Sequence, residues 1–169
     1  MHDFSHKSRE ELLLEIERLK RDVCHLEAAE LARRRVQDKL TSECNAFQAA
    51  FDLSPVPQLW HDRQGRTLRL NKAAQTLLGM ETPPPEFTIF NDPQLVLLGV
   101  PEYFKRVLAG ETVRVPKHAF NPGKTHSGAP KADRTMASVM YPVFSSNGEV
   151  TSVVTQLFDL KALAVEAKD

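Results

Sequence analysis

The first fifty residues follow the apolar period of a helix. The positions between the apolar ones are rich in Glu and Arg, and no proline or glycine occurs before Pro55. Ser8 followed by Glu11 predicts a capping box at the start of this helix. The first apolar stripe has the 4-3-4-3 spacing of a coiled-coil seam and consists of Leu12, Ile16, Leu19, Val23 and Leu26.

The stripe weakens over residues 27–35 and is followed by a second one at Val36, Leu40, Cys44, Phe47 and Phe51. This change indicates either a stutter within one helix or a turn between two helices. One helix is favoured, because no turn residue interrupts the segment.

A helix of this length cannot bury its own stripe, so we expect it to pair with a second copy, in an orientation that the pattern leaves open. The expected dimer contacts are Leu12, Ile16, Leu19, Val23, Leu26, Val36, Leu40, Phe47 and Phe51.

The pattern changes after Pro55 and Pro57, which end the helix. Short alternating or β-branched runs now predict strands, and Asn71 and Gly79 delimit a short helix as its two caps. The Asn147-Gly148 pair predicts a hairpin. We expect strands at 58–61, 66–70, from 112 onward, 134–144 and 149–158, short helices at 72–78, 92–99 and 101–109, a mobile loop at 121–133 and a short C-terminal helix at 162–169. This order indicates an α+β fold with one antiparallel sheet covered by helices on one face.

Composition and charge narrow the classes of partner. Lys and Arg together number 22, as do Asp and Glu, so net charge gives no reason to expect nucleic acid or an anionic membrane as partner. No apolar run approaches the roughly 20 residues that span a bilayer, and the N-terminus lacks a signal-peptide core. Cys24 and Cys44 lie too far apart on one helix to form a disulfide, and we expect both as small buried side chains in a cytoplasmic protein.

Several of these segments, in this order, resemble a PAS domain. They are 54–57, 62–65, the Asn71-x-Ala73-Ala74 motif up to Gly79, the 147–148 hairpin and the closing Asp159-Leu160 pair. Together they span about residues 47–161, and the preceding helix is similar to connectors beside PAS domains in bacterial sensor kinases. The final strand of the family usually ends in Asp, an aliphatic residue and Thr, but Lys161 stands at the Thr position, which puts the hinge to an output helix in doubt.

The resemblance implies a PAS fold with five antiparallel strands, a ligand pocket between the sheet and the short helices, and output through the terminal helices, with Asp159 at the exit. The expected division is 1–46 for the dimerisation helix, 47–161 for the PAS sensor and 162–169 for the exit helix. The large side chains expected around a pocket are also ordinary core residues in an alternative interpretation. They are Trp60, Phe87, Phe90, Tyr103, Phe104, Phe120, Met136 and Met140.

Cofactor chemistry finds little support in the sequence. Flavin photosensors of this family need a cysteine inside the sensor domain, and haem-binding members use a histidine on the long helix, where 101–109 has none. His61 and His118 are lone histidines, and no spacing suggests a zinc site. Gly123-Lys124-Thr125 lacks the first glycine of a phosphate loop, because His118 stands there.

No nucleophile–base pair, metal cluster or phosphate loop suggests an enzyme. The sequence therefore favours a PAS-type sensory module that dimerises through its N-terminal helix, binds a small ligand, and forms the input part of a bacterial regulator such as a sensor histidine kinase. The alternative is a PAS scaffold that only mediates protein–protein interaction.

Overall fold

The computed structural model of the chain describes residues 8–125 and 129–160. These residues divide into two units, one ending at Gln48 and the other beginning at Ala49. The division lies two residues after the boundary expected from the sequence. The helix expected at 162–169 lies outside the described residues.

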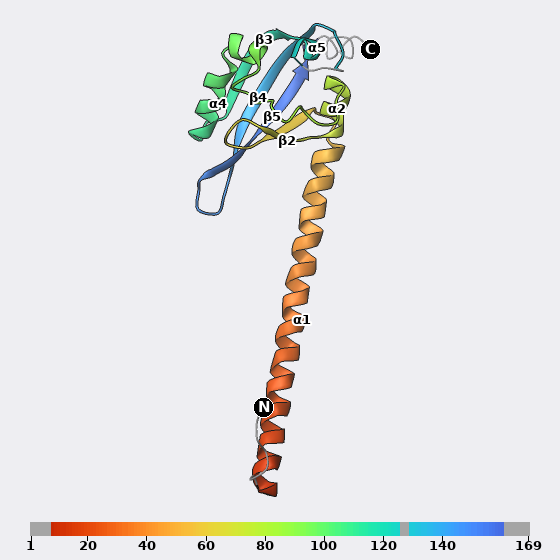
Figure 1. Cartoon of the computed structure of the whole chain (residues 1–169), viewed down its shortest axis with the longest axis vertical. Coiled ribbons are helices and arrows are strands. Elements are labelled where there is room, and N and C mark those ends of the chain that lie inside the picture. The colour runs from red at the N-terminus through yellow and green to blue at the C-terminus, as the bar shows by residue number, and fades with distance from the viewer. Residues whose placement is uncertain (1–7, 126–128, 161–169) are drawn as a thin grey trace. The chain divides into compact units, whose positions relative to one another are not determined.

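The first element is one continuous helix, α1 (Arg9–Leu53), which confirms the interpretation favoured from the sequence (Figure 1). Its first turn is closed by the expected capping box. The backbone N–H of Ser8 donates to Oε2 of Glu11 at 2.7 Å, and the N–H of Glu11 donates to Oγ of Ser8 at 3.2 Å. The helix spans both units, since its last five residues belong to the second.

The continuous helix corrects the phase shift expected near residues 27–35. Steps of four and three residues from Leu26 lead to Glu30, Arg33, Gln37 and then Leu40. Leu40, Cys44 and Phe47 therefore share the heptad frame of the first stripe, whereas Val36, an expected dimer contact, lies outside it. The seam is therefore interrupted by three polar positions and not by a stutter. The side chains on this frame are Leu12, Ile16, Leu19, Val23, Leu26, Glu30, Arg33, Gln37, Leu40, Cys44 and Phe47, and we call them the seam.

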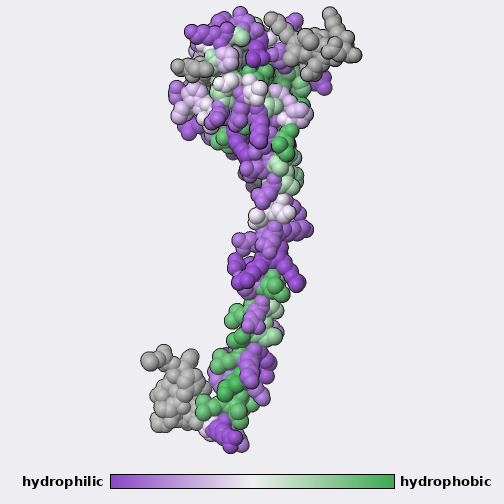
Figure 2. Space-filling view, turned by 90° about the vertical axis from the view of Figure 1, so that its right-hand side faces the viewer, coloured by the Kyte–Doolittle hydropathy of each residue, from purple (hydrophilic) through white to green (hydrophobic). Residues whose placement is uncertain are grey.

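The apolar side chains of the seam are largely exposed in the single chain. Ile16 is 47% exposed and Phe47 is 77% exposed. Figure 2 shows apolar surface along the N-terminal part of α1 and a polar stretch in its middle. In that stretch the Arg33 guanidinium donates to Glu30 at 2.8 and 2.9 Å, and its hydrogen bonds, with one from Arg34, hold the pKa of Glu30 below its ordinary value.

Five antiparallel strands form one sheet in the order β2-β1-β5-β4-β3. The hairpins β1–β2 and β4–β5 are neighbours in this order, and β5 also pairs with β1. The strands are β1 (Gln58–His61), β2 (Thr67–Leu70), β3 (Val113–Phe120), β4 (Arg134–Phe144) and β5 (Val150–Asp159). The α+β PAS fold expected from the sequence is thus confirmed.

The structure sets the end of the strand expected from residue 112 onward and corrects the segment that follows it. The strand that begins at Val113 continues to Phe120 across an irregularity between Val115 and His118, where Pro116 has no N–H to donate to the sheet. The segment 121–133, expected as a mobile loop, contains the short helix α5 (Pro122–Thr125). Asn121 stabilises its start, because its Oδ1 accepts from the N–H of Gly123 at 3.0 Å.

Three further helices lie between β2 and β3. They are α2 (Lys72–Leu78), α3 (Pro93–Leu97) and α4 (Val100–Leu108). Gly79 ends α2 with a positive φ of 67°, a conformation that glycine adopts without strain. The carboxylate of Asp92 caps α3 by accepting from the N–H groups of Gln94 and Leu95, both at 2.9 Å.

The core consists of two apolar clusters on the same face of the sheet. One joins Phe104 and Val107 of α4 to Met140 and Val153 on the central strands. The other joins α2 to the β1 side of the sheet and includes Leu59, Leu70, Ala74 and Leu78. The two clusters share this face because Leu59 and Met140 both pair directly with Thr155.

Asn71 joins the end of α1 to the sheet and to α2. Its side chain is fully buried. Its amide nitrogen donates to the carbonyls of Phe51 at 3.1 Å and Val56 at 2.8 Å, and its Oδ1 accepts from the N–H groups of Gln58 and Ala74, both at 2.9 Å. One side chain thus satisfies backbone groups of three elements.

Candidate functional site

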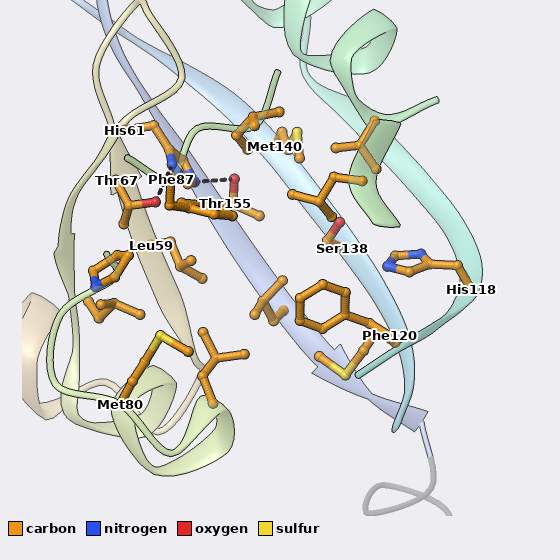
Figure 3. A pocket seen from close by; sticks show the side chains of 18 residues that line it. Leu59, His61, Thr67, Met80, Phe87, His118, Phe120, Ser138, Met140 and Thr155 are labelled. Carbon is orange, nitrogen blue, oxygen red and sulfur yellow. Dashed lines mark hydrogen bonds between the residues drawn. The ribbon is translucent and has the colours of Figure 1, made fainter. Parts of the chain in front are cut away.

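A cavity lies between the sheet and the helical segment that covers it. The volume of this cavity is about 80 Å³. Its walls are mainly aliphatic, aromatic and thioether side chains (Figure 3). The lining residues are Leu59, His61, Thr67, Leu70, Leu78, Met80, Pro83, Phe87, Ile89, Leu95, Val100, His118, Phe120, Met136, Ser138, Met140, Thr155 and Leu157.

Of the eight pocket candidates, four line this cavity: Phe87, Phe120, Met136 and Met140. Met136 and Met140 alternate with outward-facing residues of β4, so strand period placed them correctly. Phe120 reaches the cavity because β3 continues beyond Pro116.

The other four candidates do not line the cavity. Trp60 pairs with Val154 on the opposite face of the sheet, where its ring contacts Phe51 edge-on at 6.0 Å. Phe104 of α4 is fully buried in the core, and its ring lies edge-on to that of Phe90 with 5.6 Å between the ring centroids. Tyr103 packs at the rim of the same core cluster. These side chains are packing residues, as the alternative interpretation held.

His61 supplies the most buried polar group of the cavity. It is 1% exposed, and burial lowers the pKa of its imidazole from 6.5 to about 3. Nε2 lies 3.0 Å from Oγ1 of Thr155, and Nδ1 lies 3.1 Å from Oγ1 of Thr67 (Figure 3). A neutral imidazole has one donor and one acceptor nitrogen, so one hydroxyl accepts from it and the other donates to it.

Ser138 places a second hydroxyl on the same wall. It lies on β4 between Met136 and Met140 and is 4% exposed. Its side chain points into the cavity (Figure 3). The residues that the structure describes offer its hydroxyl no hydrogen-bond partner.

His118 lies near Ser138 on the neighbouring strand (Figure 3). Its Nδ1 is 2.8 Å from the carbonyl oxygen of Pro116. A carbonyl only accepts, so Nδ1 carries the proton in this contact. His61 and His118, the two lone histidines of the sequence, thus both line the cavity, each held by a neighbouring oxygen.

Sequence reasoning missed Ser138, Thr67 and Thr155 as cavity residues and treated His61 as isolated. A signal was present for two of them. His61 follows Leu59 by two positions, and Ser138 falls between two methionines at strand period, which places both on the inner face. The hydroxyl partners of His61 could not be found this way, because Thr155 is 94 residues distant.

The remaining residues to which the sequence analysis gave a role lie outside the cavity. The carboxylate of Asp159, expected at the signal exit, accepts from Arg134 at 3.0 Å across the β4–β5 pair. Phe51, expected as a dimer contact, is buried against the sheet, and Leu12 is half-buried. Both cysteines are exposed, contrary to the expectation of burial.

Comparisons with known proteins agree with this architecture. The PAS domain family model matches residues 45–111, from the end of α1 through α4. The PAS domain of an HTR-like protein from Haloarcula marismortui superposes with a TM-score of 0.55 at 13% identity, covering 75% of this chain and 99% of that chain. No curated protein matches the sequence.

Two other solved structures share the fold. The LOV protein of Rhodobacter sphaeroides has a TM-score of 0.53 at 11% identity, over 71% of this chain and 68% of that chain. The complex of phage VqmA with DPO has a TM-score of 0.51 at 14% identity, over 79% of this chain and 60% of that chain. The folded unit that begins at Ala49 is a PAS domain, and a long helix precedes it.

Within the described ranges, no helix has the length and apolar content needed to cross a membrane.

Proposed function

We propose that this chain is a sensory signal-transduction module, which binds a small molecule in its PAS cavity and pairs with a second copy through α1. The observation that carries the sensory part is the apolar cavity, with its buried His61 and the two threonines beside it. A small-molecule site typically combines mainly apolar walls with a few placed polar groups. One solved structure that shares this fold, that of phage VqmA, is a complex with DPO.

The working mode in this proposal is binding and not catalysis. The titratable side chains that line the cavity are His61 and His118. Both ring nitrogens of His61 are engaged with threonine hydroxyls, and Nδ1 of His118 is engaged with a carbonyl. Neither arrangement pairs a nucleophile with a free base.

The module would form the input part of a larger bacterial regulator, such as a sensor histidine kinase. Asn71 supports this role, because it ties the last turn of α1 to the wall that carries the cavity. A shift of that wall upon ligand binding would reach α1 through this residue. The two free, exposed cysteines favour a reducing compartment, so the proposed location is the cytoplasm.

Native mass spectrometry of the purified full chain tests the sensory proposal. Protein freshly purified from bacterial cells, sprayed before and after gentle denaturation, should show a non-covalent mass that denaturation removes. A chain that stays at its sequence mass, and whose melting temperature no member of a small-molecule library raises, would refute ligand sensing.

A PAS scaffold without a ligand is the second candidate. The observation in its favour is the small volume of the cavity, about 80 Å³. This is room for roughly two or three waters at the ~30 Å³ that one water occupies in the liquid, and much of the remaining interior is filled by Phe104, Val107 and their neighbours.

We further propose that the two α1 helices pair in parallel and in register. In that arrangement Glu30, Arg33 and Gln37 occupy three consecutive layers, and every apolar layer of the seam meets its own copy. In an antiparallel pair that places Glu30 of one helix opposite Arg33 of the other, Gln37 would lie opposite Leu26 in two layers. Parallel pairing therefore places fewer polar groups against apolar ones.

The two cysteines distinguish these orientations. Cys44 is in the seam, whereas Cys24 follows Val23 and lies outside it. A disulfide needs Cα atoms within about 7 Å, which a parallel pair provides at Cys44. Mild oxidation should yield a covalent dimer of the Cys24→Ser variant but not of Cys44→Ser. Cross-linking through Cys24, or a dimeric mass with no cross-link at Cys44, would contradict the parallel arrangement.

A further inference from the structure

Ser138 is the polar group of the cavity that most needs a partner. Its backbone pairs with Leu157 on β5 and Val115 on β3, so the side chain is fixed in the centre of the sheet. The hydroxyl faces the cavity and makes no hydrogen bond with any residue that the structure describes. Because the hydroxyl opens onto the cavity, a molecule that offers a polar atom here can form a hydrogen bond without displacing one made by the protein.

The His61 arrangement supplies a second hydrogen-bonding point. The protonated ring nitrogen donates a hydrogen bond to one threonine hydroxyl. The other threonine hydroxyl donates a hydrogen bond to the unprotonated nitrogen. Thr155 is the more deeply buried of the two, at 3% exposed. When Nε2 carries the proton, Thr155 keeps a hydroxyl proton to donate. When Nδ1 carries it, Thr155 offers only lone pairs.

The spacing of these hydroxyls limits the size of the ligand. Thr155 pairs with Met140, and Ser138 pairs with Leu157, so Ser138 and Thr155 are diagonal neighbours on one face. Diagonal neighbours lie about 7–8 Å apart. A single ring with polar atoms at two of its edges spans this separation, and the methionines of the lining can shift to admit it.

The charge of the lining limits the ligand further. None of the residues that line the cavity is Asp, Glu, Lys or Arg. A carboxylate or ammonium group in this space would find no Asp, Glu, Lys or Arg as counter-ion, which is unfavourable. The remaining wall is apolar, with thioethers of Met80, Met136 and Met140 that can adapt to a ring.

We propose, on the basis of the sensory function above, that the cavity selects an uncharged, single-ring molecule that hydrogen-bonds to the hydroxyl of Ser138 and, at a second edge, to Thr155. His61 is a positioning residue in this site, because it orients the hydroxyl of Thr155. The recognition is by hydroxyl groups at a ring edge and not by an ion pair.

Two matched pairs of probes test this ligand class on the full chain. Phenol and toluene have the same number of nonhydrogen atoms and differ in a hydroxyl, and benzamide and benzoate differ in charge. Titrations followed by the methyl signals of Met80, Met136 and Met140, which line the cavity, give an affinity for each probe. Benzamide should bind and benzoate should not.

The Ser138→Ala variant isolates the hydrogen bond. The ratio of phenol affinity to toluene affinity should fall by roughly twofold to tenfold in this variant, as expected for one hydrogen bond. Ser152→Ala is the matched control, since Ser152 is a buried strand serine that does not line the cavity, and it should keep the wild-type ratio.

Failure of the ligand class can be told from failure of the sensory function. The ligand class is wrong, while binding in the cavity stands, if phenol and toluene both bind and the ratio of their affinities is the same in Ser138→Ala as in wild type. The same conclusion follows if benzoate binds more tightly than benzamide. If no probe shifts the methionine signals and native mass spectrometry finds no bound molecule, the sensory function fails as well.

Discussion

The N-terminal part of α1 and the PAS domain use their apolar side chains in opposite ways. Along α1 the seam side chains are exposed, as Ile16 and Phe47 show, and side-chain contacts such as those of Arg33 and Arg34 with Glu30 join near neighbours on the helix. In the PAS domain, Phe104 and Val153 are fully buried against elements distant in sequence. A helix satisfies its backbone locally but cannot bury a stripe alone, whereas the sheet and its helices bury theirs within one chain.

The largest expected effect comes from Asn71, the buried residue that secures the PAS domain to the end of α1. Asn71→Ala removes the hydrogen bonds that the carbonyls of Phe51 and Val56 accept from its amide, and it takes away the side-chain acceptor of the buried N–H of Gln58. The free energy of unfolding should fall by about 3 kcal/mol or more, measured by urea denaturation. Asn45→Ala, at an exposed position of α1, is the control and should change it by less than about 0.5 kcal/mol. Equal effects in the two variants would refute the role of Asn71.

The next effect concerns the exposed seam. Leu19→Glu places a charge in a layer of the proposed dimer, where two leucines would otherwise be buried at about 1.5–3 kcal/mol each. The dissociation constant should rise by at least about 100-fold, and sedimentation at micromolar concentration should show a monomer. Leu68→Glu, at an exposed leucine of β2, should leave the dimer intact. A wild-type chain that is already monomeric would exclude pairing through α1.

The buried histidine makes the PAS domain sensitive to acid. The pKa of His61 is about 3 in the folded chain, because burial disfavours the imidazolium, and about 6.5 in the unfolded chain. Below pH 6.5 the unfolded chain therefore binds a proton that the folded chain does not. This contribution to stability is complete above pH 6.5 and is lost as the pH falls toward 3.

Between pH 7 and pH 5 the loss due to His61 should be about 2 kcal/mol. His61→Gln should remove this part of the pH dependence, whatever its effect on stability at pH 7. Denaturant titrations of wild type and variant at pH 5, 6 and 7 measure the slopes. Parallel slopes for the two proteins would show that His61 is protonated in the folded state or exposed there.

The smallest effect distinguishes function from packing within the cavity. Ser138→Ala removes a hydroxyl that has no partner among the described residues. Without added ligand, its free energy of unfolding should equal that of wild type or exceed it by up to about 1 kcal/mol. Thermal unfolding measures this difference. A clear loss of stability would mean that the hydroxyl stabilises the fold and is not reserved for a ligand.

Much of the fold was predictable because its signals are local. The capping bond of Asn71 to Ala74, the positive φ of Gly79 and the Asn147-Gly148 turn involve residues close in sequence, so caps and hairpins could be placed from the sequence. The short helix α5 was missed, since Pro122 and Gly123 are typical of loops. The continuity of α1 was favoured from the sequence, but its unbroken heptad frame became clear only when the helix was known to be continuous.

The sequence by itself determined the PAS fold, the long N-terminal helix and the alternation that puts Met136 and Met140 on the inner face, because propensity, caps and strand period are local properties. Only the tertiary structure decided that Trp60 lies on the other face, that Phe104 belongs to the core, and that His61 meets Thr155. These depend on which strands pair and on how close distant side chains come. Such distances are set by packing of the whole domain.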